Sequence, residues 1–160
     1  VRLVPFIEEM NREMLAVEGL PKGDYALYID GQRIGSWSAA ALAEGINLAV
    51  ENTPQYRQAQ QVMYLNEYRW EIERTFRDYA WVEYDFLQQK GLLGADDERA
   101  VQALDREKSK NVWLQIHREN FARMMHAPVR EAREEEMALL VRKIYEINKP
   151  QTRRVVLRRE

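Results

Sequence analysis

Few side chains in this sequence could act as a nucleophile or as a general base. The serines are Ser36, Ser38 and Ser109, and the histidines are His117 and His126. Ser36 and Ser38 lie in "GSWSA", which differs from the Gly-x-Ser-x-Gly turn that exposes a nucleophile. A hydrolytic triad also needs a serine held against a histidine and a carboxylate, and no spacing here brings these together. We therefore predict no catalytic residue in this chain and expect surface or interface histidines.

Metal and cofactor chemistry is not indicated either. Glu119 follows His117 by two residues, so on a helix the two side chains point to different faces and cannot easily share an ion. The run Arg133–Met137 is typical of a solvated helix face. Cysteine is absent, which excludes thiolate ligands and disulfides. We predict no metal site and no cofactor.

One helical face combines aromatic and cationic residues. Trp70, Arg74, Arg77 and Trp81 are spaced by four, three and four residues, which places them on one side of a helix. Tryptophan and arginine are enriched at protein interfaces, and both can also contact a sugar ring or a carboxylate. The pattern leaves three interpretations open: packing within the chain with Arg–Asp pairs, contact with another domain or subunit, and ligand binding.

Long helices must carry this face. Thr53-Pro54 is a helix start, with Thr as N-cap and Pro in the first turn, and no Gly or Pro interrupts the chain from there to Gln89. A second long helix is predicted from Asp96 or Asp97 to Met124. A third is predicted beyond Pro128, ending near 148–150. The apolar stripe of the first helix comprises Leu65, Tyr68, Ile72, Phe76, Tyr79, Val82 and Phe86.

A β-hairpin precedes the helices. Asp30-Gly31 separates "DYALYI" from "QRIGSW", and Asp-Gly favours the type I′ turn of a two-residue hairpin loop. Such a loop pairs Ile29 with Gln32, Leu27 with Ile34, and Tyr25 with Ser36. We expect residues 14–17 to supply a third strand. Ser38 is predicted to cap a short helix that ends at Gly45.

These elements predict an α+β fold that is predominantly helical. A small antiparallel sheet, with its hairpin at 24–37, is followed by two or three long antiparallel helices. Residues 1–50 form the sheet region with its short helix, residues 51–149 form the long-helix region packed on it, and residues 150–160 form a tail that can add an edge strand. The arginines of that tail, which would keep an edge strand soluble, are Arg153, Arg154, Arg158 and Arg159.

Composition excludes several classes of protein. The chain has 160 residues, 46% of them hydrophobic and 31% charged, as in a globular domain. The net charge of −2 argues against a general nucleic-acid binder. No apolar run approaches the roughly 18 residues of a membrane span. The first residue is Val1 rather than Met and no signal peptide is present, so we expect a processed or truncated chain.

A longer pattern resembles a known family. The string "LAVEGLPKGDYALYIDGQRIGSWSAAALAEGINLA" is followed by "TPQYRQAQQV" and "RDYAWVEY". It is similar to the C-terminal region of bacterial SGNH/GDSL-type esterases from about Leu15 to Tyr84. The catalytic Gly-Asp-Ser and Asp-x-x-His blocks of that family do not occur here, so no catalytic residue carries over.

The resemblance implies a non-catalytic accessory region of an ester hydrolase. The catalytic α/β domain of the same parent protein would lie before Val1, and this region would pack on it and shape its cleft. It also implies a periplasmic or extracellular origin. An alternative is a stand-alone helical module for protein interaction or homo-oligomerisation, supported by the long first helix and the Trp/Arg face. A third hypothesis is a carbohydrate-binding module that uses Trp37, Trp70 or Trp81.

Overall fold

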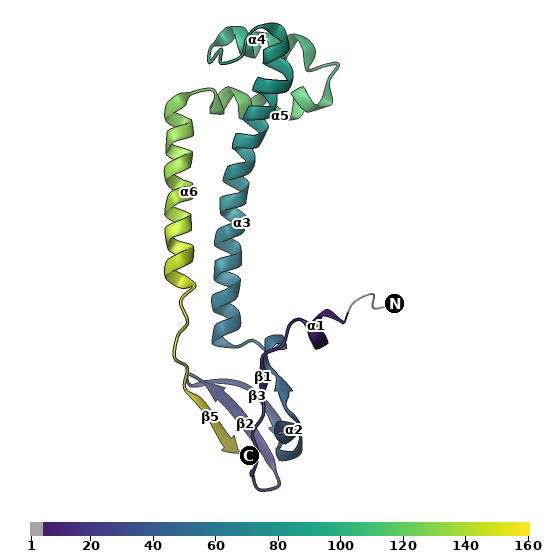
Figure 1. Cartoon of the computed structure of the whole chain (residues 1–160), viewed down its shortest axis with the longest axis vertical. Coiled ribbons are helices and arrows are strands. Elements are labelled where there is room, and N and C mark those ends of the chain that lie inside the picture. The colour runs from purple at the N-terminus through teal and green to yellow at the C-terminus, as the bar shows by residue number, and fades with distance from the viewer. Residues whose placement is uncertain (1–4) are drawn as a thin grey trace. The chain divides into compact units, whose positions relative to one another are not determined.

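The computed structural model describes residues 5–160, and the chain is α+β and mostly helical, as predicted (Figure 1). It divides into two compact units. One comprises the chain up to Val62 together with Ile147–Glu160, and the other comprises Met63–Glu146. Helix α3 (Pro54–Trp81) begins in the first unit and continues into the second.

The first unit contains a three-stranded antiparallel sheet. Strands β2 (Asp24–Ile29) and β3 (Gln32–Ser38) form the hairpin, and β5 (Val155–Arg159) pairs with the other edge of β2. The strand order is β3-β2-β5. Asp30 has φ 52° and Gly31 has φ 83°, so both central residues of the turn have positive φ, as a type I′ turn requires. The predicted hairpin is confirmed.

The predicted register is right only next to the turn. Ile29 pairs with Gln32, but a bulge follows, so that Leu27 pairs with Gly35 and Tyr25 with Trp37. The pairings of Leu27 with Ile34 and of Tyr25 with Ser36 are therefore wrong. A bulge places an extra residue in one strand and shifts every later pair by one position.

Residues 14–17 do not join this sheet. Strand β1 (Met14–Leu15) pairs instead with β4 (Ile46–Asn47) in a separate two-stranded ladder. The expected third strand is thus wrong, because β5 occupies the free edge of β2. Helix α2 (Ala39–Glu44) lies between β3 and β4, and its N-terminal Ala41 N–H donates to Ser38 Oγ at 3.1 Å. The predicted Ser38 cap is confirmed.

The remaining short elements of this unit are α1 (Phe6–Glu9) and the 3-10 helix η1 (Leu48–Val50). The core forms where one face of the sheet meets α2 and the segment after it. Its buried side chains are Tyr25, Leu27, Ile29, Leu42, Ile46 and Leu48.

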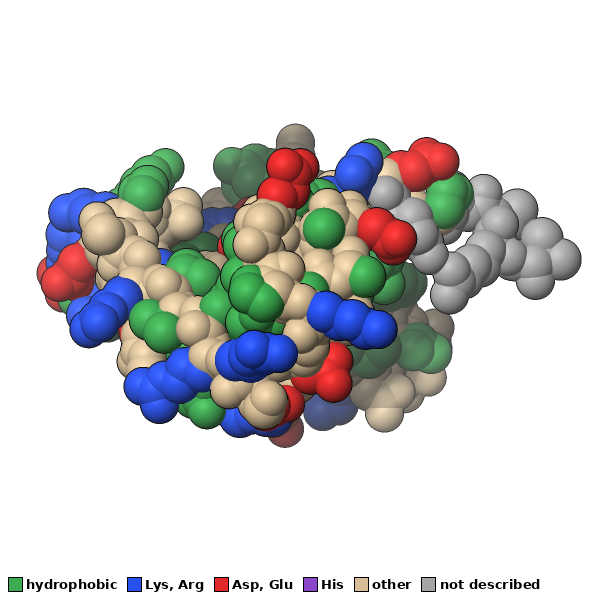
Figure 2. Space-filling view, turned by 90° about the horizontal axis from the view of Figure 1, so that it is seen from below, with side chains coloured by type: hydrophobic (Ala, Val, Ile, Leu, Met, Phe, Trp, Pro, Cys, Tyr) green, Lys and Arg blue, Asp and Glu red, His purple; other side chains and the backbone are tan. Residues whose placement is uncertain are grey.

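Asp30 joins the hairpin turn to the C-terminal tail. Its Oδ1 accepts the Arg154 N–H at 2.8 Å, and its Oδ2 pairs with Arg153 at 3.0 Å. These two hydrogen bonds, that of the Arg154 backbone first, lower the pKa of Asp30. The guanidinium of Arg158 lies 4.8 Å from the Tyr28 ring centroid. Figure 2 shows basic and acidic side chains interspersed with small apolar patches on one face of the molecule, as is usual for a solvated surface.

The long first helix starts where it was predicted. The Tyr56 N–H donates to Thr53 Oγ1 at 3.1 Å, so Thr53 is its cap. After Trp81 the helical path continues as a π-helix, η2 (Val82–Leu87), and a 3-10 turn, η3 (Gln88–Lys90), and it ends at Gly91 with φ 70°. The chain is helical to Gln89 as expected, with a wider turn in its last part.

The predicted second helix is two helices. Helices α4 (Glu98–Glu107) and α5 (Val112–Met124) are separated by residues 108–111. The single-helix prediction is wrong because the Asn111 side chain accepts the N–H groups of Trp113 and Leu114 and starts a new helix. Helix α6 (Ala127–Ile147) has Pro128 in its first turn, where proline is tolerated.

The core of the second unit lies where the end of α3 and the π-helix meet α4 and α5. Phe121 of this core stacks on the ring of Tyr79, with ring centroids 5.5 Å apart. The buried side chains are Val82, Leu87, Ala95, Ala100, Leu104, Leu114, Phe121 and Met125.

Candidate functional site

The structure brings together only some of the predicted Trp/Arg face. The Arg77 guanidinium lies 5.8 Å from the ring centroid of Trp70, whose residue is 52% exposed. Arg77 also pairs with Glu73 at 2.9 Å. Arg74 pairs with Glu71 at 2.7 Å. Both arginines thus meet glutamates of their own helix rather than aspartates, and the role of this face stays a prediction.

Trp81 belongs to an aromatic cluster at the end of α3. Its ring centroid lies 6.0 Å from that of Trp113 and 5.7 Å from that of His117, both of α5. Trp113 and His117 are stacked, with centroids 5.3 Å apart and planes 13° apart. Sequence reasoning placed Trp81 with Arg77 and missed this cluster, because the partners lie more than thirty residues away in the chain.

A carboxylate lies beside the histidine of this cluster. His117 Nδ1 lies 3.4 Å from Asp78 Oδ2, and the histidine is 9% exposed. A cleft of about 300 Å³ opens beside the pair and is lined by Arg77, Asp78, Trp81, Trp113 and His117.

The cleft has the chemistry of a recognition surface. None of the serines lines it, so His117 and Asp78 lack the nucleophile that a triad requires. Trp113 is 61% exposed, so it offers an open aromatic plane on which a flat apolar group can stack. The guanidinium of Arg77 adds a cation at the rim. Such a surface can hold a side chain of another domain or a planar ligand.

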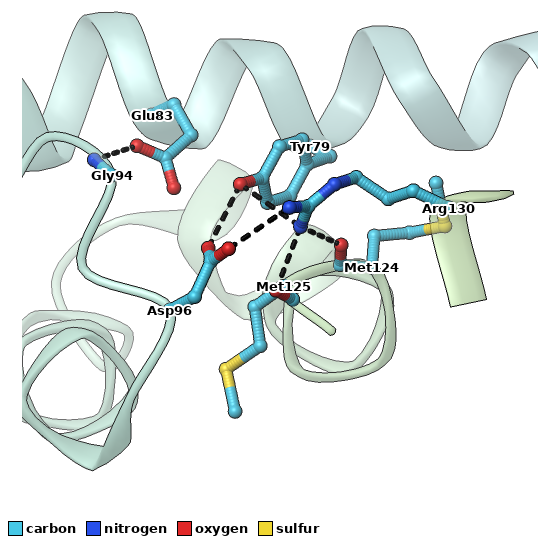
Figure 3. Close-up of polar contacts among 7 residues, drawn as sticks. All are labelled: Tyr79, Glu83, Gly94, Asp96, Met124, Met125 and Arg130. Carbon is cyan, nitrogen blue, oxygen red and sulfur yellow. Dashed lines mark hydrogen bonds and ion pairs between the residues drawn. The ribbon is translucent and has the colours of Figure 1, made fainter. Parts of the chain in front are cut away.

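A second polar group of residues, which includes Asp96 and Arg130, lies around Tyr79 of α3 (Figure 3). The Tyr79 hydroxyl donates to Asp96 Oδ1 at 3.0 Å, and Arg130 Nη2 donates to Asp96 Oδ2 at 2.9 Å. Arg130 Nη1 donates to the carbonyl oxygens of Met124 and Met125, both at 2.7 Å. Arg130 therefore satisfies carbonyl groups at the end of α5 that have no partner within the helix.

Burial and the charges of this network shift the pKa values of Tyr79 and Arg130. Burial, followed by the hydrogen bond to Asp96, raises the pKa of Tyr79 well above its usual range. Burial acts to lower the pKa of Arg130, but the hydrogen bond to Asp96 and nearby negative charge outweigh it and raise the pKa. Both shifts favour the protonated forms, the neutral phenol and the charged guanidinium, which donate hydrogen bonds to Asp96.

Sequence reasoning also missed Glu83. This residue is 4% exposed, and its Oε2 accepts the Gly94 N–H at 2.7 Å (Figure 3). The signal was present, because Glu83 follows Tyr79 of the apolar stripe by four residues and so lies on the core face of a helix. Asp96 or Asp97 was expected to begin the second long helix; Asp97 is the cap of α4, and Asp96 instead accepts from Tyr79.

The described part of the chain contains neither a metal cluster nor a membrane-spanning helix. Among the side chains that the structure describes, no group of three or more His, Asp or Glu could hold an ion. None of the helices in that range combines the length and the apolar character that crossing a membrane requires.

The chain matches a protein family and a solved structure. The model of the family described as "Diltiazem deacetylase C-terminal helical domain" matches residues 60–149. The solved structure of a gut microbial diltiazem-metabolizing enzyme superposes with a TM-score of 0.90 and is 57% identical in sequence. The match covers 98% of this chain and 36% of that one, so this chain spans about a third of that enzyme's length. No curated protein matches the chain.

Proposed function

This chain belongs to the diltiazem deacetylase C-terminal helical domain family, and from that membership we propose that it is the non-catalytic accessory region of a larger ester hydrolase. In this proposal the hydrolase is of SGNH/GDSL type, with its catalytic serine in an α/β domain of the same parent protein. The accessory region packs on that domain and shapes the cleft in which the ester binds.

Family membership is the observation that carries the proposal. A deacetylase is a hydrolase, and the similar solved enzyme is nearly three times as long as the part that this chain matches. In residues 5–160 the serines do not line the His117–Asp78 cleft. Together these observations support a catalytic site in another part of the parent protein.

The Trp/Arg face and the adjacent cleft are the surface that would meet the catalytic domain. Trp70 and Trp113 are both more than half exposed, although tryptophan usually buries most of its surface. Exposed aromatic residues beside arginines are typical of the central, energetically dominant part of an interface. We propose acetyl esters of small organic molecules as the substrate class, because the family is named after a deacetylase.

The test is a comparison of variants in the longer parent protein. Trp81→Ala and Trp113→Ala should raise the KM for an acetyl ester several-fold while the kcat stays within about twofold. The reason is that they loosen the contact that shapes the substrate cleft of the catalytic domain and leave the reacting groups unchanged. Tyr145→Ala is a matched control, since Tyr145 is an aromatic residue of the same unit that is 72% exposed and lines none of the clefts described above.

Two results would contradict the proposal. One is a parent protein that hydrolyses no acetyl ester or that carries no Gly-Asp-Ser block before Val1. The other is a set of Trp81 and Trp113 variants whose KM values equal those of the wild type. If the parent is an active hydrolase but the variants are unaffected, only the assignment of the surface fails.

A homo-oligomerisation module is the second candidate, favoured by the same exposed tryptophans. It predicts a dimer whose population rises with protein concentration in sedimentation experiments and falls in Trp81→Ala. A chain that remains monomeric at every concentration excludes it.

A further inference from the structure

Residues 6–14 expose apolar side chains on a segment that is held in place. Phe6 is 56% exposed, Ile7 46% and Met10 69%. Met14 of strand β1 is 48% exposed. The end residues of a domain are usually poorly ordered unless they are tied down, and large exposed apolar patches mark interaction sites. An ordered apolar segment therefore indicates a surface that another body covers.

The side chain of Asn47 holds this segment. Its Nδ2 donates to the Asn11 carbonyl oxygen at 2.9 Å and to that of Ile7 at 3.4 Å. Its Oδ1 accepts the Glu13 N–H at 2.9 Å and the Ala49 N–H at 3.1 Å. One amide thus uses both its donor and its acceptor groups on the backbone. Asn47 therefore joins the segment to the 3-10 helix η1 and fixes its position in the first unit.

Helix α1 brings two of the exposed side chains together. The N–H groups of Met10 and Asn11 both donate to the Phe6 carbonyl oxygen at 2.8 Å, which closes a helical turn. Residues four apart on such a turn are neighbours, so Phe6 and Met10 form a small apolar ridge. Aromatic residues and methionine are both enriched at protein interfaces, and methionine adapts its shape to the surface that it meets.

A cleft adjoins the end of the segment. It measures about 430 Å³, and its apolar lining includes Met14, Leu48 and Val155. Val155 is 49% exposed. Gln58 and Arg153 also line the cleft, but Arg153 Nη2 already donates to Gln58 Oε1 at 2.9 Å. The cleft therefore offers apolar contacts and suits an apolar side chain of a protein partner.

The rest of the parent protein is the body best placed to cover this surface. The family is described as a C-terminal domain, and the match covers only 36% of the similar enzyme. A C-terminal region follows the rest of its chain, so the preceding part is the nearest body along the chain to residues 6–14. A covalently linked partner also has a high effective concentration, so a small apolar contact is sufficient to hold it.

We propose that residues 6–14 are a docking segment that fixes this region on the catalytic domain of the same parent protein. Phe6 and Met10 pack on that domain, and the cleft beside Met14 receives one of its apolar side chains. Asn47 orders the segment before it docks, which lowers the entropy cost of the contact. The inference rests on the proposed function for the identity of the partner, and it adds a contact of the first unit to that of the Trp/Arg face.

The experiment is hydrogen exchange of the whole parent protein, measured by mass spectrometry for the backbone amides of residues 6–13. We expect slow exchange in the wild type. In Phe6→Ser/Met10→Ser these amides should exchange at least about tenfold faster, because the variant removes two apolar side chains from the interface. Both side chains are more than half exposed in this chain, so the substitutions weaken the docking contact and leave the core of the unit intact.

Two single variants complete the set. Asn47→Ala should speed exchange of the same amides several-fold, because it removes the hydrogen bonds that order the segment. If Asn47→Ala fails to fold, the double variant decides. Leu139→Ser is the matched control, since Leu139 is an apolar residue of α6 that is 57% exposed and lines none of the clefts described above. It should leave exchange of residues 6–13 unchanged.

The proposal is overturned if the wild-type segment exchanges as fast as a free peptide of the same sequence, or if Phe6→Ser/Met10→Ser exchanges as slowly as the wild type. It is also overturned if about hundredfold dilution removes the protection, since a second copy would then cover the segment.

Hydrolysis of an acetyl ester by the same samples separates this inference from the proposed function. An active parent with an unprotected segment contradicts only the docking. An inactive parent whose segment is protected in the wild type and exposed in the double variant supports docking on the preceding domain and contradicts the proposed function.

Discussion

Asp105 of α4 receives two parallel hydrogen bonds from Arg118 of α5, from Nε to Oδ1 at 3.1 Å and from Nη2 to Oδ2 at 3.0 Å. Lys108 adds a third contact to Oδ1 at 2.8 Å. This bidentate ion pair joins α4 and α5, the two helices into which the predicted second helix is divided.

The Asp105–Arg118 pair should make stability depend on pH. The hydrogen bonds from Arg118, and then that from Lys108, hold the pKa of Asp105 well below its usual range. A lowered folded-state pKa gives stability that is fully present above the unfolded pKa of about 3.9 and is lost as the pH falls through the folded pKa. Because the two side chains are 31% and 35% exposed, solvent screening limits the contribution to about 1 kcal/mol.

Urea unfolding of Asp105→Asn tests this. At pH 7 the free energy of unfolding should fall by up to about 1 kcal/mol, and the difference from the wild type should shrink as the pH falls below about 4. Asp85→Asn serves as the control, since Asp85 is exposed. A loss of the same size at pH 7 and pH 2 would show that packing rather than charge is responsible.

Phe121 should be the most sensitive position of α5. It is fully buried and stacked on Tyr79, so Phe121→Ala leaves a cavity and should cost about 3–5 kcal/mol. Ile116→Ala on the same helix, where Ile116 is 62% exposed, should cost less than about 0.5 kcal/mol. Chemical denaturation followed by circular dichroism compares the two, and equal losses would contradict the packing described here.

Asn111 should be necessary for the start of α5. Its side-chain oxygen accepts the N–H groups of Trp113 at 3.0 Å and of Leu114 at 3.4 Å. Asn111→Ala leaves them without this acceptor and should cost about 1 kcal/mol, while Asn111→Asp, which keeps an acceptor, should cost less. Thermal unfolding measures both. An alanine variant as stable as the wild type would mean that water satisfies these groups equally well.

Gly35 is the position of the hairpin that should tolerate a side chain least. A Cβ there would collide with the Trp37 indole ring, because residues two apart lie on the same face of a strand. Gly35→Ala should therefore displace the indole and cost about 1–3 kcal/mol. Tryptophan fluorescence and urea unfolding report both effects. Ser36→Ala, on the opposite face of β3, should leave the fluorescence unchanged.

Local features of the fold could be predicted from short segments. Asp30-Gly31 specifies its turn, while Ser38, Thr53 and Asp97 cap the helices that follow them. Each of these depends on hydrogen bonds or dihedral angles within a few residues, so the local sequence is sufficient to determine them. The α+β class follows from the same signals.

Other features depended on contacts between distant segments. The bulge that shifts Leu27 onto Gly35, and the pairing of β2 with β5 more than a hundred residues later, have no signature in either strand alone. The candidate sites also depend on contacts between distant segments. Helical spacing located Arg77 and Trp81, but only the tertiary structure placed Trp113 and His117 beside Trp81 and left one oxygen of Glu83 buried without a partner. The sequence by itself determined the hairpin turn, the helix caps and the fold class. Packing between distant segments decided which strands pair and which side chains meet, because those contacts form only when the whole chain has folded.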